Sequence, residues 1–220
     1  MTDEVYIFSG LGADERVFQR LDFTGVSTTF IKWTSPSKNE TIEQYATRLL
    51  DQIKTPRPIL IGLSFGGLMA VEIAKQIDTE KVILISSAKT KSEIPFYYRI
   101  VGLLRLHKLV PTGLLRRSNF FTNWFFGTST RFDKDLLKKI LTDTDPIFLK
   151  WAIDKIVNWR NQTHIKNIIH IHGTSDKILP SHFVNCDIEI VDGGHFMVLN
   201  KADELNELLG QQLRRTKNWA

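Results

Sequence analysis

The feature that most constrains the fold is an apolar run over residues 58–63 that ends abruptly in a Gly-x-Ser-x-Gly pentapeptide at residues 62–66. A helix-like sequence follows, so the predicted order is strand, sharp turn, helix. At such a turn the serine backbone is strained and its hydroxyl is lifted clear of the sheet, which requires glycine at the flanking positions. Because the pentapeptide also occurs by chance, two interpretations of Ser64 stay open at this point: a nucleophile, or a residue that caps the following helix.

Further apolar runs alternate with helical patterns along the chain. Thr41 and Gln44 form a predicted capping box at the start of one helix. Strands separated by helices imply a mostly parallel sheet covered on both faces, so the sequence predicts a three-layer α/β/α protein with about six strands. Besides 58–63, the predicted strands are 5–8, 28–33, 81–87, 168–172 and 188–191, and the predicted helices of this part are 13–21, 42–53, 68–77 and 205–213.

Residues 89–160 interrupt this alternation, because they contain no convincing strand and are too long for an ordinary connection. Helical patterns cover 99–109, 112–126, 133–142 and 146–160, the last opened by Asp145 with Pro146 at the first helical position. We therefore predict an α/β core formed by residues 1–88 and 161–220, with residues 89–160 inserted as a helical cap.

Composition excludes several classes of protein. Cys186 is the only cysteine, so neither a disulfide framework nor a cysteine zinc cluster is present. The first residues lack the basic and apolar regions of a leader, and no run is apolar for long enough to span a bilayer. We expect a cytoplasmic protein without stable membrane insertion.

The net charge of +5 is unevenly distributed. Residues 89–140 contain eleven Lys or Arg against three acidic residues, a net charge of +8, so the remainder of the chain carries −3. Only the predicted cap is basic.

The turn after the first strand is glycine-rich and raises the question of a dinucleotide site. Gly10 and Gly12 are present, but Glu15 stands where the third glycine should be, and a carboxylate there would repel a pyrophosphate. Such a turn can instead present a backbone N–H to a developing oxyanion.

If Ser64 is a nucleophile, it needs a base and an acid that orients the base. In a parallel sheet these should follow the carboxyl ends of strands. His195 follows Gly193-Gly194 directly after a strand, and Asp176 follows another strand. The competing acids are less well placed, because Asp192 is too close in sequence to His195 and Glu93 lies several residues beyond its strand.

With these residues the sequence resembles the α/β-hydrolase family over nearly its whole length, as a compact member with a helical cap. Residues 62–66 resemble the nucleophile elbow of that family, residues 172–176 followed by Pro180 its acid loop, and residues 194–196 its histidine loop. Residues 9–12 are similar to its oxyanion turn, except that Ser9 replaces the usual histidine.

The resemblance implies a serine hydrolase that transfers an acyl group from an ester or thioester. Ser64 would attack the carbonyl, His195 would act as base, Asp176 would hold the imidazolium, and the N–H groups of Leu11 and Phe65 would form the oxyanion hole. No metal or organic cofactor is required. An alternative stays open, in which the fold serves ligand binding, a lyase reaction or an inactive scaffold.

Aromatic residues interleave with the basic charges of the predicted cap. One interpretation is that these aromatics form the core of the cap and its contact with the sheet, with Lys and Arg as the solvated face. Another is that an apolar pocket holds an acyl chain while the basic rim attracts an anionic or carrier-bound small-molecule substrate, or rests on an anionic membrane surface. No motif for nucleic-acid binding accompanies the basic charge, and we expect no binding to nucleic acid.

Overall fold

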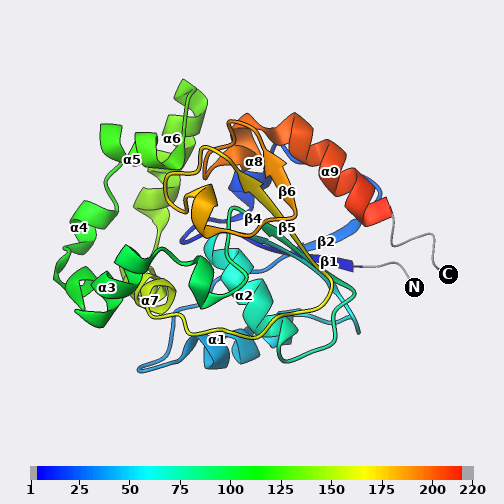
Figure 1. Cartoon of the computed structure of the whole chain (residues 1–220), viewed down its shortest axis with the longest axis horizontal. Coiled ribbons are helices and arrows are strands. Elements are labelled where there is room, and N and C mark those ends of the chain that lie inside the picture. The colour runs from blue at the N-terminus through cyan, green and yellow to red at the C-terminus, as the bar shows by residue number, and fades with distance from the viewer. Residues whose placement is uncertain (1–3, 215–220) are drawn as a thin grey trace.

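Six parallel strands form one sheet in the order β2-β1-β3-β4-β5-β6 in the computed structural model, which describes residues 4–214 (Figure 1). The predicted fold class is confirmed. The strands are β1 (Glu4–Phe8), β2 (Ser27–Phe30), β3 (Ile59–Leu63), β4 (Lys81–Ile85), β5 (Ile168–Gly173) and β6 (Ile188–Ile190).

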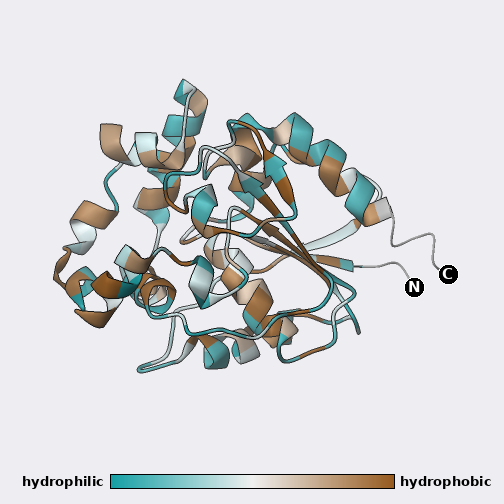
Figure 2. Ribbon diagram, viewed as in Figure 1, coloured by the Kyte–Doolittle hydropathy of each residue, from teal (hydrophilic) through white to brown (hydrophobic). Residues whose placement is uncertain are grey.

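Successive residues of the strands alternate between two hydrophobic cores, one on each face of the sheet. In β1, Val5 and Ile7 face the core that includes α8 (Met197–Asn200) and α9 (Ala202–Arg214). Tyr6 and Phe8 face the core beneath α1 (Ile42–Leu49) and α2 (Phe65–Ala74). Both faces are therefore covered, which explains why these strands are apolar along nearly their whole length (Figure 2).

The register of the strands brings their carboxyl ends to one edge of the sheet. Phe8 pairs with Gly62, and Leu63 pairs with Ile85. Ile85 in turn pairs with Ile171 on β5. The loops that follow β1, β3, β4 and β5 consequently meet at the same edge, where a ligand site of a parallel sheet is expected.

Between β4 and β5 the chain forms the cap segment, which we define as residues 89–160. Within it, the structure contains helices and no strand (Figure 1). Asp145 caps α7 as predicted, with Pro146 in the first turn. The helices are α3 (Phe96–Leu103), α4 (Thr112–Leu115), α5 (Phe120–Phe126), α6 (Arg131–Asp143) and α7 (Pro146–Val157).

Several predicted helices were wrong in extent. The pattern over 99–109 forms the end of α3 and a separate 3₁₀ turn at Leu106–Leu109, because the backbone of Arg105 is left-handed. The pattern over 112–126 forms two helices, because Asn119 has an extended backbone and caps α5 by accepting the N–H of Thr122. The pattern over 13–21 forms only a short 3₁₀ turn at Glu15–Phe18, where the Asp14 carboxylate accepts the Arg16 N–H. Such local side-chain bonds compete with the α-helix.

The helices of the cap segment differ in how they pack. Leu137 and Ile140 of α6 join the core on the α9 side of the sheet, and Phe148 and Ala152 of α7 join the core on the α2 side. In contrast, α4 and α5 bury no residue. In the part of the chain that the structure describes, no helix is long and apolar enough to cross a bilayer.

Candidate active site

Ser64 lies at the sharp turn between β3 and α2, with φ 53° and ψ −119°. A side chain at Gly62 would lie 2.5 Å from the Gly66 carbonyl oxygen, and one at Gly66 would lie 2.3 Å from the Phe8 carbonyl oxygen. Any residue larger than glycine would collide with backbone at either position. The glycines of the pentapeptide are therefore required by packing, and the strained serine backbone exposes its hydroxyl at the edge of the sheet.

The structure brings Ser64, His195 and Asp176 together from three separate loops. Nε2 of His195 lies 2.8 Å from Ser64 Oγ, and Nδ1 of His195 lies 2.7 Å from Asp176 Oδ2. Asp176 and His195 are only 4% and 5% exposed, whereas Ser64 is partly open to solvent. A continuous chain of hydrogen bonds thus runs from the serine hydroxyl to a buried carboxylate.

The carboxylate of Asp176 is held in its ionised form. Its second oxygen, Oδ1, accepts the backbone N–H groups of Ile178 at 2.9 Å and Leu179 at 2.8 Å. Burial opposes ionisation, but the charge and hydrogen bond of His195, together with the N–H of Leu179, outweigh it and lower the pKa of Asp176. Asp176 can therefore act as an acceptor that fixes the tautomer of His195.

His172, near the end of β5, lies behind this pair. Its Nε2 is 2.8 Å from the Leu179 carbonyl oxygen and 3.6 Å from Asp176 Oδ2. Burial lowers the pKa of His172, although Asp176 acts in the opposite direction. The neutral ring therefore donates from Nε2 and helps to place the acid loop. Its position four residues before Asp176 on the same strand end was the available sequence signal.

The turn at residues 9–12 lies beside Ser64, since a side chain at Gly10 would contact the Ser64 Cβ at 3.7 Å. Leu11 lines the cavity next to the serine, and Phe65 is the first residue of α2. Among residues 4–214, neither the Leu11 nor the Phe65 backbone N–H has a hydrogen-bond acceptor. Both predicted oxyanion donors are consequently available beside the hydroxyl.

Ser9 supports this turn in place of the histidine that the resemblance implies. Its hydroxyl donates to the Ala13 carbonyl oxygen at 2.5 Å and accepts the indole N–H of Trp33 at 2.9 Å. Ser9 is buried, so these bonds are shielded from water. The departure from the family pattern is compensated by a partner that lies 24 residues away in sequence.

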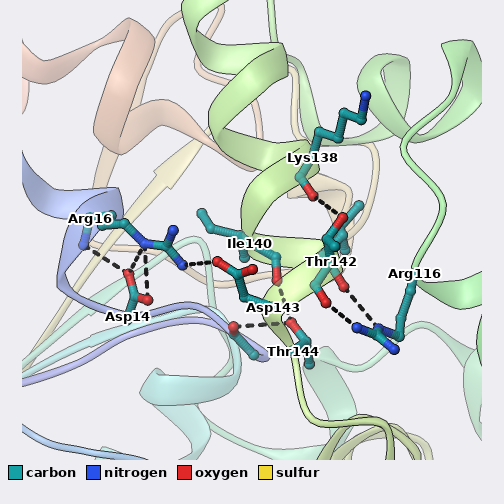
Figure 3. A network of polar contacts seen from close by, with 10 residues as sticks. Asp14, Arg16, Arg116, Lys138, Ile140, Thr142, Asp143 and Thr144 are labelled. Carbon is teal, nitrogen blue, oxygen red and sulfur yellow. Dashed lines mark hydrogen bonds and ion pairs between the residues drawn. The ribbon is translucent and has the colours of Figure 1, made fainter.

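The cap segment fixes the other end of the same turn (Figure 3). Gly12 has a φ of +64°, and a side chain there would collide with Thr144, which follows α6. The Thr144 hydroxyl lies 3.1 Å from the Gly12 carbonyl oxygen. Nearby, Arg16 bridges Asp14 and Asp143 at 2.8 Å each. The position of the turn at residues 9–12 therefore depends on the end of α6.

Two small, largely apolar cavities flank Ser64. The first has a volume of about 120 Å³ and the second about 60 Å³. Phe126 of α5 lines the first, and Tyr98 of α3 lines the second, where its hydroxyl donates to the Ile178 carbonyl oxygen at 2.9 Å. Burial raises the pKa of Tyr98 to about 12, so this phenol stays neutral. The space beside Ser64 is therefore suited to a small apolar group.

The competing acids lie elsewhere. Glu93 is buried and accepts the N–H groups of Lys89 and Asn185, and burial raises its pKa. Asp192 is exposed in a turn. Over the residues that the structure describes, His, Cys, Asp and Glu side chains form no group of three or more that could hold a metal ion.

Comparison with known proteins relates the chain to one family. Residues 5–208 match the model of a family described as "Alpha/beta hydrolase family". No curated protein matches the chain significantly. Similar solved structures include a bromoperoxidase from Bacillus anthracis (18% identity, TM-score 0.70, covering 97% of this chain and 92% of that one).

Two further structures are an esterase from Exiguobacterium antarcticum (15% identity, TM-score 0.72, covering 96% and 92%) and an N-acyl homoserine lactone degrading enzyme (16% identity, TM-score 0.69, covering 96% and 93%). At these identities the likeness shows a shared fold.

Proposed function

This chain belongs to the alpha/beta hydrolase family, and from that premise we propose that it is a serine hydrolase acting on carboxylic esters or thioesters through an acyl-enzyme intermediate. The observation that carries the proposal is the hydrogen-bonded chain from Ser64 through His195 to Asp176, at 2.8 and 2.7 Å. A scaffold or binding protein has no need of a strained serine backed by a base and a buried acid. The alternative without hydrolysis is therefore disfavoured.

The proton transfers follow from the tautomer of His195. Asp176 accepts a hydrogen bond from the Nδ1–H group of His195, so Nδ1 keeps its proton and the unprotonated Nε2 can take the proton of Ser64 as its Oγ attacks the carbonyl carbon. When the bond between that carbon and the leaving oxygen or sulfur breaks, the Nε2 proton passes to the leaving group. Water then attacks the acyl-serine, gives its proton to Nε2, and Ser64 leaves with that proton.

In each tetrahedral intermediate the former carbonyl oxygen carries a negative charge that must be stabilised. In the proposed mechanism the N–H groups of Leu11 and Phe65, which have no acceptor among residues 4–214, donate to it. Each such donor typically contributes about 3 kcal/mol to the stabilisation of the transition state. Because both are backbone groups held by packing, they need little reorganisation during the reaction.

The larger cavity supports a short, neutral acyl group. Its volume of about 120 Å³ is somewhat below the roughly 150 Å³ of a protein cavity that holds benzene. Its lining contains no Lys or Arg among the described residues, so any anionic part of a substrate belongs on the leaving-group side. We therefore propose a small-molecule ester or thioester with a short acyl chain, cleaved without a metal or organic cofactor.

The test is the pre-steady-state hydrolysis of p-nitrophenyl butyrate, with a butyryl thioester as a second substrate. We expect a burst of p-nitrophenol close to one equivalent of enzyme when deacylation is slower than acylation, and turnover of both substrates. Ser64→Ala is the control, because it should fold normally and lose both the burst and the turnover. Turnover that survives in Ser64→Ala would contradict the proposal.

A further inference from the structure

Large hydrophobic side chains that are exposed to solvent are concentrated in the cap segment. Of the fifteen that are exposed in the described part of the chain, fourteen lie between residues 96 and 147, and the other is Val191. The interpretation that the aromatics form the core of the cap is therefore wrong for most of them. Exposed apolar side chains that are scattered singly are normal, whereas a concentration of them in one region marks an interaction site.

Most of these side chains belong to the helices at one end of the molecule, α3, α4 and α5, and to the turn between α3 and α4 (Figures 1 and 2). Five of the seven residues of α5 are aromatic, yet none is buried. We call this set the cap apolar face and define it as Ile100, Leu103, Leu104, Leu106, Leu109, Leu114, Phe120, Phe121, Trp124 and Phe125.

The chain segment that carries the cap apolar face is basic, and the acidic group of α7 beside it, Asp154, is paired with His107 and Lys108. Residues 94–132 contain six Lys or Arg and no Asp or Glu. Arg99, Arg105 and Arg117 are exposed, and none of the three forms an ion pair with a described residue. A partner for this face must therefore supply both hydrocarbon and negative charge.

We propose that the cap apolar face binds the surface of an anionic lipid bilayer. A bilayer supplies acyl chains for the leucines, an interface for Trp124 and the phenylalanines, and anionic head groups for the arginines. A second copy of this chain fits less well, because a symmetric dimer through this face would bring the unpaired arginines of both copies together. Nucleic acid lacks the hydrocarbon that exposed leucines require.

Contacts of α5 connect this surface to the proposed catalytic histidine. The Phe126 carbonyl oxygen accepts the N–H of Phe196, the residue after His195, at 3.1 Å. The Phe126 ring lies edge-on to the His195 ring at 5.9 Å and lines the larger cavity. Docking would thus place the cavity at the bilayer surface, where apolar esters accumulate. This consequence rests on the proposed function, whereas the binding itself does not.

The experiment is vesicle flotation of the Ser64→Ala protein, so that binding is measured without turnover. Vesicles of phosphatidylcholine mixed with phosphatidylglycerol are compared with vesicles of phosphatidylcholine alone. We expect binding that is at least about tenfold tighter to the anionic vesicles and that weakens as salt is raised. On binding, the emission of Trp124 should shift to shorter wavelength, and this change should be absent in Trp124→Phe.

Two variants separate the contributions of charge and hydrocarbon. Replacing Arg99, Arg105 and Arg117 by Gln should weaken binding on the order of 100-fold, because each arginine near an anionic surface contributes about fivefold. The matched control replaces Lys32, Lys54 and Lys166, which are exposed outside the cap segment, and should bind like the parent.

Phe120→Ser combined with Phe121→Ser should also abolish binding while the circular dichroism and thermal unfolding stay unchanged. Equal binding to neutral and anionic vesicles, or no binding to either, would overturn the proposal. Concentration-dependent dimerisation that Phe120→Ser and Phe121→Ser remove would overturn it in favour of a second copy of this chain.

Discussion

The sheet with its flanking helices and the outer helices of the cap segment treat apolar side chains in opposite ways. Every residue of β3 is buried, and nine of the ten residues of α2 are buried. In α4 and α5 no residue is buried, although α5 is mostly aromatic. Apolar side chains therefore stabilise the fold in the sheet region, whereas in the outer cap helices they face solvent.

The two regions therefore have different roles in the proposed site: the sheet loops hold the reacting groups, and the cap segment lines the cavity. Ser64, His195 and Asp176 all lie on loops of the sheet, where packing leaves little freedom. From α5 the cap segment contributes Phe126, which shapes the cavity without supplying a proton or a nucleophile. We expect substitutions near the sheet to abolish chemistry or folding, and substitutions in the outer cap to change which molecules are bound.

The largest expected effect is on turnover. His195→Ala should lower kcat by roughly 10⁴-fold or more, since His195 is the base that is hydrogen-bonded to Ser64 Oγ. Asp176→Asn should come close to that loss, because an amide no longer selects the tautomer that leaves Nε2 free. Steady-state kinetics with p-nitrophenyl butyrate measure both variants. A loss of less than about tenfold in either would show that the sheet loops do not hold the catalytic groups.

A matched pair of leucines compares the two regions directly in stability. Leu60 of β3 is 0% exposed and Leu103 of α3 is 78% exposed. Leu60→Ala should lower the free energy of unfolding by about 2–5 kcal/mol, through lost burial and the cavity left behind. Leu103→Ala should change it by no more than about 0.5 kcal/mol. Urea denaturation followed by circular dichroism gives both values, and similar losses would remove the distinction between the regions.

The pH dependence of stability reports on His170, which is buried in β5. Burial, followed by the neighbouring His172 and Lys89, lowers the pKa of His170 from 6.5 to about 3. Between these two values the unfolded chain binds a proton that the folded protein does not. His170 therefore lowers the free energy of unfolding as the pH falls, by up to about 1.4 kcal/mol per pH unit, and contributes no such loss above 6.5.

His170→Leu tests this dependence. Neither ring nitrogen of His170 forms a well-formed hydrogen bond with a described residue, so leucine should fold at neutral pH with little loss. The measurement is the free energy of unfolding from pH 7 down to pH 4.5. As the pH falls, the free energy of unfolding should decrease less steeply in the variant than in the wild type, and the difference in slope should correspond to about one proton. Equal slopes would contradict a neutral, buried His170.

The smallest expected effect is on acyl-chain preference. Phe126→Ala should enlarge the cavity and raise kcat/KM for p-nitrophenyl octanoate relative to butyrate by about tenfold. Phe121→Ala, an exposed neighbour on the same helix that does not line the cavity, is the control and should leave the ratio unchanged. A ratio that moves equally in both variants would mean that α5 acts on the site through more than Phe126.

Local patterns were sufficient to predict the parts of the molecule that depend on neighbouring residues. The strand, turn and helix around Ser64 follow from glycine spacing and hydrophobicity, and the capping box of Thr41 and Gln44 is present. Asp176 and His195 were predicted because parallel strands bring their carboxyl ends to one edge. The structure places both beside Ser64, and their catalytic roles stay predictions.

Long-range contacts could not be predicted in the same way. The bond from Trp33 to Ser9 and the packing of Thr144 against Gly12 join segments whose sequences carry no sign of each other. The exposure of Phe120 and Phe121 was also missed, because an aromatic residue in a helix has the same local pattern whether it packs inward or faces solvent. Whether such a side chain is buried depends on how the layers of the folded protein pack together.

The most direct test of the proposed nucleophile is intact and peptide mass spectrometry after exposure to a fluorophosphonate probe. We expect one stoichiometric adduct on the peptide that contains Ser64, absent in Ser64→Ala and in His195→Ala. The two variants separate the site of attack from its activation by the base. No adduct on folded wild-type protein, or an adduct that persists on another serine in Ser64→Ala, would contradict the assignment of Ser64 as an activated nucleophile.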